Sequence, residues 1–197
     1  MPPGSVAAQL LSLRREHVGV CRDFYLERLV PYAESPGFAR RLEDEVEACL
    51  GPVGEVFGVG NSGDPEQDAY WLAIDSLLFQ REESAIPVAQ RLLKFDKQLG
   101  DAQRGLLAEW IGDVPHDFFE VARQHDGCWT LRSLESGDTF DEVYSLFDEP
   151  PAVPMGRGAI VFARLLPCSG AWLSSWPLER FPDDEAREIR ARVAARG

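Results

Sequence analysis

The sequence predicts an α+β protein in which a helical region precedes a small five-stranded antiparallel β module and a final helix. Two patterns carry this prediction. Over the first half of the chain, apolar residues recur at three- and four-residue steps, which is typical of helices that pack one face on a core. From Phe118 to Trp176, short β-branched and aromatic runs alternate with turn residues about every 8–12 positions, which favours a small barrel. An SH3-like barrel is the first expectation, and an OB-like barrel is the second.

The helical region is expected over residues 1–112. Its first helix runs from Ser5 to about Ala33, where Pro31 ends or bends it. Further helix starts are indicated by a capping side chain that is followed by a proline in the first turn. This pattern occurs at Ser35-Pro36, at Asp64-Pro65 and, with a longer spacing, at Ser84 and Pro87. A loop is expected between residues 52 and 63.

The β module is expected over residues 113–181, and the final helix over residues 182–197. Asp126-Gly127 supplies the positive φ that a tight hairpin turn needs. Prolines and glycines from Pro150 to Gly158 break the chain before the fourth strand. That strand, from Ala159 to Leu166, is apolar on both faces apart from Arg164, so it is expected to be central.

The composition limits the classes of partner. The chain has 197 residues, 45% of them hydrophobic, which is enough for a substantial core. Its 20 basic and 33 acidic residues give a net charge of −13, which disfavours nucleic acids and anionic membranes. No apolar run reaches the roughly 18–20 residues of a membrane span, and no basic lead suggests a signal peptide. Four scattered cysteines indicate buried thiols and a cytoplasmic protein.

No catalytic or cofactor-binding residue is predicted. The segment Gly58-Val59-Gly60-Asn61-Ser62-Gly63 matches G-x-G-x-x-G, but helices rather than a strand precede it. A loop that ends in a helix cap is therefore the preferred interpretation, and a dinucleotide phosphate cradle is the alternative. The sequence has no Gly-Lys-Ser/Thr for a P-loop and no G-x-S-x-G elbow.

No metal site is predicted either. His17 and Cys21 share a helical face, but no nearby His or Cys completes a ligand set. His116 and His125 flank the first strand, so an extended chain separates them by roughly 25–30 Å. The acids of the β module lack the spacing of an EF-hand loop and suit a solvated rim. They are Glu135, Asp138, Asp141, Glu142, Asp148 and Glu149.

Several segments between Tyr70 and Trp176 follow a familiar spacing. They are Trp71 with Asp75, Leu106-Leu107-x-x-Trp110, Phe118-Phe119-Glu120-Val121, Leu131-x-x-Leu134 with Ser136-Gly137, and the run from Gly158 to Pro167. On these segments, about half of the chain, the sequence resembles uncharacterised bacterial proteins associated with the SEC-C motif. The resemblance implies a helical part followed by a small β barrel, with no established activity. The clustered Cys and His of the SEC-C zinc motif are absent, so zinc is not implied.

The expected function is that of a non-enzymatic protein-binding or adaptor module of the bacterial cytosol, with another protein as its partner. A small barrel offers such a partner a groove between its turns or a free sheet edge. The candidate interaction surface consists of Trp71, Asp75, Trp110, Glu120, Trp129, Arg164 and Trp172.

Two alternatives remain open. The first is a small-molecule-binding protein or enzyme with its site where the helical region meets the barrel. The second, less favoured by the charge, is a nucleic-acid-associated factor, for which Arg40, Arg41 and the C-terminal arginines are the local concentrations of positive charge. Self-association through the amphipathic first helix is also left open.

Overall fold

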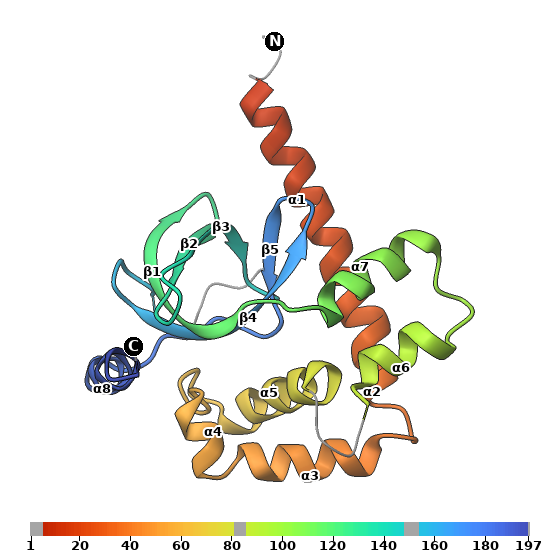
Figure 1. Ribbon diagram of the computed structural model, residues 1–197, viewed down its shortest axis with the longest axis horizontal. Coiled ribbons are helices and arrows are strands. Elements are labelled where there is room, and N and C mark those ends of the chain that lie inside the picture. The colour runs from red at the N-terminus through yellow and green to blue at the C-terminus, as the bar shows by residue number, and fades with distance from the viewer. Residues whose placement is uncertain (1–5, 81–85, 148–153, 197) are drawn as a thin grey trace.

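A computed structural model describes residues 6–80, 86–147 and 154–196 of the chain. Helices form the part up to Ile111, five strands then form a closed barrel, and a last helix lies against the side of that barrel (Figure 1). The predicted α+β fold with a small barrel and a C-terminal helix is therefore confirmed. None of the described helices is long and apolar enough to cross a bilayer.

The first helix is continuous to Ala33, as predicted, and contains one widened turn. It comprises α1 (Val6–Phe24), the π-helical segment η1 (Tyr25–Leu29) and α2 (Val30–Ala33). The amide of Val30, which follows η1, bonds back to the carbonyl of Tyr25 and closes the wide turn. The wide turn directly precedes Pro31, which has no amide proton to donate to a helix.

The described residues before the barrel form five further helices. They are α3 (Ala39–Cys49), α4 (Pro52–Val56), α5 (Pro65–Phe79), α6 (Val88–Phe95) and α7 (Asp101–Ile111). Asp64 caps α5 as predicted, because its carboxylate accepts a hydrogen bond of 3.1 Å from the amide of Gln67. The predicted start at Ser35-Pro36 is wrong, since a turn carries the chain to Phe38, which is buried. The predicted loop after Gly51 contains α4, while the predicted cap at Ser84 lies outside the described residues.

The barrel strands fall where the sequence placed them. They are β1 (His116–His125), β2 (Cys128–Ser133), β3 (Thr139–Tyr144), β4 (Ile160–Cys168) and β5 (Ala171–Ser174). The strands close in the order β1-β2-β3-β5-β4, and β3 runs parallel to β5. The prediction of a purely antiparallel module is therefore wrong. This order matches the OB-like alternative, and its closure removes the free sheet edge that was expected for a partner strand.

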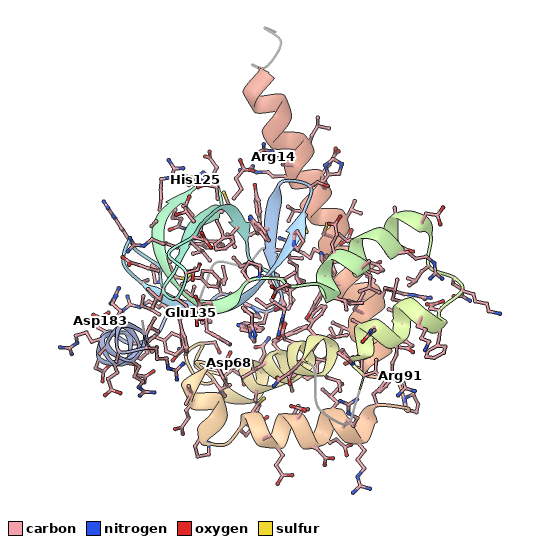
Figure 2. The ribbon with its side chains drawn as sticks, viewed as in Figure 1. Arg14, Asp68, Arg91, His125, Glu135 and Asp183 are labelled. Atoms are coloured by element: carbon pink, nitrogen blue, oxygen red, sulfur yellow. The ribbon has the colours of Figure 1, made fainter. Side chains whose placement is uncertain are left out.

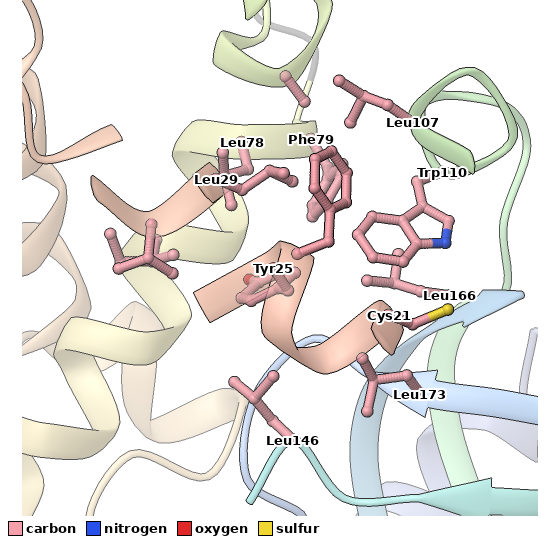
Figure 3. Packing of buried hydrophobic residues seen from close by; sticks show 14 of the residues in the cluster. Cys21, Tyr25, Leu29, Leu78, Phe79, Leu107, Trp110, Leu146, Leu166 and Leu173 are labelled. Atoms are coloured by element: carbon pink, nitrogen blue, oxygen red, sulfur yellow. The ribbon is translucent and has the colours of Figure 1, made fainter. Parts of the chain in front are cut away.

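One hydrophobic cluster joins the helices to the barrel. Trp110 of α7 is fully buried, with its ring 5.8 Å from that of Phe24. Its Nε1 donates a hydrogen bond of 2.9 Å to the carbonyl oxygen of Pro167 in β4. Figure 3 shows side chains from both parts packed together, among them Cys21, Tyr25, Trp110, Leu166 and Leu173. Helices and barrel thus share a core.

The last helix, α8 (Asp183–Ala194), covers a different side of the barrel. Its inward residues Ala186 and Ile189 pack on a cluster that includes Ile160 and Phe162 of β4. Three acids in its first turn suit the positive end of the helix dipole. Cover on this side is incomplete, because a cleft remains between α8 and the barrel.

Candidate functional site

The cleft between α8 and the barrel has a volume of about 570 Å³, which is within the usual range for ligand sites. Apolar side chains from the barrel, α4 and α8 form its floor: Val56, Phe118, Leu134, Phe162, Ile189 and Val193. Polar side chains form its rim: His116, Asp117, Glu135, Arg192 and Arg196. An apolar floor with a few polar groups above it is the usual composition of a binding site.

A second, more open hollow of about 520 Å³ adjoins this cleft. The two hollows share His116, Asp117 and Glu135, which line both of them. The second hollow continues over Asp113 and Asp138 on the barrel. We call the two hollows together the barrel–helix groove. Figure 2 shows Glu135 at the end of the barrel next to α8, opposite the end that carries His125.

The charges of the groove are segregated along it. Arg192 lies on the wall made by α8, and Arg196 lies in the turn that follows this helix; both line the cleft. Arg192 also pairs with exposed Glu188 at 2.9 Å, a contact that contributes little in water. The exposed acids Asp113 and Asp138 line only the second hollow, whereas Glu135 lies between the two ends and lines both hollows. The groove is therefore basic at one end and acidic at the other.

His116 at the centre of the groove is held from behind by a buried ion pair. Asp75 of α5 is 1% exposed and Arg164 of β4 is 8% exposed. The Arg164 Nε donates to both oxygens of Asp75, at 3.0 and 3.1 Å. The other end of the guanidinium lies 3.2 Å from His116 Nδ1. Burying such a pair costs solvation energy. Replacing only one of its two residues costs more, because the other charge then stays buried without a partner.

This contact favours one tautomer of a neutral His116 ring. A guanidinium only donates hydrogen bonds, so His116 Nδ1 accepts one and the ring proton lies on Nε2. Burial lowers the pKa of His116, and the charge of Arg164 lowers it further, against the opposite effect of Asp75 and Asp117. Within the described part of the chain, Nε2 forms no hydrogen bond. The neutral ring thus offers one N–H to the groove.

Asp117 is already used by the fold. Its carboxylate accepts the hydroxyl of Ser133 and the amides of Glu135, at 3.1 Å, and Phe118, at 2.6 Å. These bonds shape the turn between β2 and β3. The Ser133 hydroxyl in turn accepts the amides of Glu135 and Ser136. Neither the serine nor the aspartate is set up as a nucleophile and base.

The seven residues expected to form an interaction surface do not lie together on a surface. Trp110 and Trp129 are buried in the core, since indole rings are the largest apolar groups available to fill it. Asp75 and Arg164 neutralise each other inside the protein. The expected surface is therefore wrong for these four residues.

The other three residues lie apart from one another. Glu120 pairs with Arg132 at 2.7 Å on the outside of the barrel. Trp71 is half-buried, with its ring 4.9 Å from that of Phe147. Half-buried Trp172 packs at right angles to Phe140. None of the three lines the barrel–helix groove.

The Gly58–Gly63 loop binds one of the chain's own carboxylates. Asp68 accepts the amides of Gly60, at 2.8 Å, and Ser62, at 3.2 Å. Gly58, Gly60 and Gly63 have φ values of +93°, +99° and +90°, which explains the glycines. A phosphate in this loop would meet the charge of Asp68. The segment is therefore a loop that ends at the N-terminal cap of α5, which agrees with the preferred interpretation of a loop that ends in a helix cap.

His116 and His125 lie at the two ends of β1, as predicted. His125 is near Cys128, with 3.7 Å between the sulfur and Nδ1. Cys128 is buried, which raises the pKa of its thiol, and the thiol donates to the carbonyl of His125. This arrangement keeps the sulfur protonated rather than activated.

No group of three or more His, Cys, Asp or Glu side chains that would suit a metal ion occurs among the described residues, which exclude Asp148 and Glu149. Comparisons with models of protein families, with curated proteins and with solved structures gave no significant match. The resemblance to proteins associated with the SEC-C motif therefore stays a prediction.

Sequence reasoning missed the groove because its parts come from distant segments. His116, Glu135 and Arg192 belong to β1, a turn and α8, and no local spacing relates them. One signal was available, namely the single arginine in the apolar strand β4 and an aspartate, Asp75, in the otherwise uncharged second half of α5. Two lone opposite charges in buried elements predict a pair. The Asp75–Arg164 pair in turn contacts His116, which lines the groove.

Proposed function

We propose that the chain is a non-enzymatic binding protein that holds an extended segment of a partner protein in the barrel–helix groove. The observation that carries the proposal is the arrangement of the groove, with an apolar floor between a basic end and an acidic end. Segregated charge selects a ligand with complementary charges and sets its direction. A segment with an apolar anchor, acidic residues on one side and basic residues on the other meets these conditions.

The polar groups of the groove suit main-chain recognition. His116 presents a neutral N–H, which pairs with a peptide carbonyl and adds no charge. The apolar floor receives the anchor side chain, and Phe118 and Phe162 supply flat aromatic area there. Because the barrel is closed, the segment lies across the groove instead of adding a strand to the sheet.

A display selection with random peptides tests this function, since the probe is defined and no natural partner is needed. We expect the wild-type protein to enrich peptides with an apolar anchor between acidic and basic flanks. The double substitution Arg192→Glu with Arg196→Glu should weaken the best peptide about tenfold or more. Arg40→Glu, on the exposed face of α3, is the matched control and should leave the affinity unchanged.

A charge swap sharpens the selection. Exchanging the acidic flank of the best peptide for lysines should weaken binding to the wild type and restore binding to the doubly substituted protein. If no consensus emerges, or if the affinity is the same for the groove variant and the control, the proposed function is wrong.

A second candidate function is supported by the size of the cleft and by its histidine. A cleft of about 570 Å³ accommodates a small molecule. His116 lines this cleft and contacts Arg164, which belongs to the joint between the helices and the barrel. A thermal-shift screen with metabolites separates the two candidates. A stabilising metabolite whose effect is lost in His116→Ala would favour the small-molecule function.

A nucleic acid is the least favoured ligand. The net charge is −13, and the outer side of the barrel carries Glu120, Asp141 and Glu142. The end of the barrel near the β1–β2 turn is approached by α1, whose Arg15 bonds to the carbonyl of Asp126. Acidic walls repel phosphates.

A further inference from the structure

A second groove lies on the helical region, away from the barrel–helix groove. Figure 1 shows α1 and α7 on the opposite side of the barrel from α8. A groove of about 390 Å³ lies between these two helices, and we call it the α1–α7 groove. Apolar side chains from both helices line it: Val20, Phe24, Ala102 and Leu106. None of these residues lines the barrel–helix groove.

The apolar lining of the α1–α7 groove is open to solvent. Val20 is 64% exposed, Ala102 is exposed and Leu106 is half-buried, while Phe24 beneath them is buried. Leu13 is 51% exposed and lies seven residues before Val20, so both side chains are on the same side of α1. A concave apolar surface between two helices is the kind of surface that receives the apolar face of another helix.

The charge of the α1–α7 groove is negative. Asp23 of α1 and Glu27 of η1 line it and are exposed, and neither forms an ion pair or hydrogen bond with another described residue. Among the described residues that line the groove, Arg28 is the single cation, and it pairs with Asp96 at 2.5 Å. Glu16 is exposed on the same face of α1 as Asp23 and adds a third acid. The acids are therefore left to pair with a partner.

These charges select one kind of occupant. A second copy of α1 would bring Glu16, Asp23 and Glu27 against the same three acids, and like charges at a contact repel. A nucleic acid is repelled for the same reason. A helix that carries an apolar stripe with Lys or Arg beside it complements both the apolar lining and the acids.

Two glycines in these helices agree with a close contact to another helix. Gly19 of α1 directly precedes Val20, and Gly105 of α7 directly precedes Leu106. A Cβ added at either glycine would meet nothing within 4 Å, so packing inside the described chain does not require glycine there. Glycine weakens a helix relative to alanine, whereas it allows the backbone of a neighbouring helix to come closer.

We propose that the α1–α7 groove binds an amphipathic helix of a partner protein, with the apolar stripe of that helix over Val20 and Leu106 and its basic flank against Asp23 and Glu27. This site shares no lining residue with the barrel–helix groove and does not depend on the function proposed for that groove. Because the two acids are exposed, added salt should weaken the complex.

A display library of single stable helices, randomised along one face, tests the proposal against the full-length protein. We expect enrichment of helices with apolar residues at three- and four-residue steps and with Lys or Arg beside them. Asp23→Lys with Glu27→Lys should weaken the best helix about tenfold or more. Asp44→Lys with Glu47→Lys, on the exposed face of α3, is the matched control and should leave the affinity unchanged.

A steric variant tests the groove itself. Ala102→Trp places a ring in the groove from an exposed position, so it should weaken the best helix about tenfold or more and leave the unfolding temperature unchanged. Ala108→Trp, at an exposed position of α7 outside the lining, should keep the affinity. Arg192→Glu with Arg196→Glu should also keep it, which separates this site from the barrel–helix groove.

A charge swap completes the test. Replacing the basic flank of the best helix with Glu should weaken binding to the wild type and restore binding to the Asp23→Lys, Glu27→Lys protein. No enrichment, enrichment of acidic or uncharged helices, or equal affinities for the groove variants and their controls would overturn the proposal. A wild-type dimer in analytical ultracentrifugation that Ala102→Trp converts to a monomer would also overturn it, because the occupant would then be a second copy.

Discussion

The barrel is covered on two sides, and the two covers differ in how completely they fill the space. Toward α1, α5 and α7 the helices and the barrel share one buried core that contains Trp110, and the buried Arg164–Asp75 pair links the barrel to α5. Toward α8 the contact is also apolar, but it leaves a cleft of about 570 Å³. The filled side behaves like a domain core, whereas the open side has the composition of a binding site.

This difference explains which residues attract attention in a sequence. A tryptophan or a lone charge in an apolar segment stands out whether it fills a core or binds a ligand. Trp110, Asp75 and Arg164 stand out and belong to the filled side. The groove is made of ordinary residues whose importance comes from their position. The following predictions separate the two sides by stability and by binding.

The largest effect is expected from Asp75→Asn on the filled side. The change leaves the Arg164 guanidinium buried without a counter-charge, which should lower the unfolding free energy by about 3–5 kcal/mol. Urea unfolding measures the loss. The double substitution Asp75→Leu with Arg164→Met should recover most of it, since no charge remains buried. A single-variant loss below about 1 kcal/mol would mean that the pair does not hold the joint.

A smaller loss is expected from Trp110→Phe. The substitution leaves a cavity and removes the N–H that bonds to Pro167, which together cost about 2–3 kcal/mol in unfolding free energy. Trp172→Phe is the matched control, because that ring is only half-buried, and it should cost about 1 kcal/mol. Equal losses in urea unfolding for the two variants would remove the distinction between the filled joint and the rest of the barrel.

The unfolding free energy should depend on pH through His116, which lines the groove and contacts the buried ion pair of the filled side. Because its pKa is lowered by burial, the unfolded chain takes up a proton below about pH 6.5 while the folded protein does not. The unfolding free energy should therefore fall as the pH drops, by less than ~1.4 kcal/mol per pH unit, since one side of the residue faces solvent.

Urea unfolding between pH 5 and pH 8 measures this contribution. His116→Gln should flatten the curve relative to the wild type, and His17→Gln, at an exposed position on α1, should leave it unchanged. A wild-type curve that His116→Gln does not alter would show that His116 stays accessible to protons in the fold.

The smallest change in stability is expected in the groove. Arg192→Glu with Arg196→Glu should alter the unfolding free energy by no more than about 0.5 kcal/mol per site, because both side chains are exposed. Thermal unfolding is the readout. A loss of binding without a loss of stability identifies a site, whereas a large destabilisation would show that this wall of the groove is structural.

The fold was predictable where local chemistry decides it. Asp126 and Gly127 have positive φ values in the β1–β2 turn, and Asp64 caps α5, as the sequence indicates. The parallel pairing of β3 with β5 was not predictable, because it joins strands that are not consecutive and depends on closing the barrel. The start of α3 was displaced by the burial of Phe38, a tertiary contact that overrides a capping signal.

The candidate site was less predictable than the fold for a related reason. Its floor combines residues of α4, two strands and α8, which only the folded chain brings together. His116 looked like a residue at the end of a strand, and the contact with Arg164 that favours one tautomer of its neutral ring is not local in sequence. Local patterns predict elements, whereas sites between elements require their packing.

Hydrogen exchange with and without the selected peptide is the most direct test of the central claim, that the open side of the barrel binds and the filled side does not. The claim predicts added protection of residues 113–119, 133–140 and 186–196, and unchanged exchange in α1 and α7. Protection confined to α1 and α7, or no added protection near α8, would contradict it.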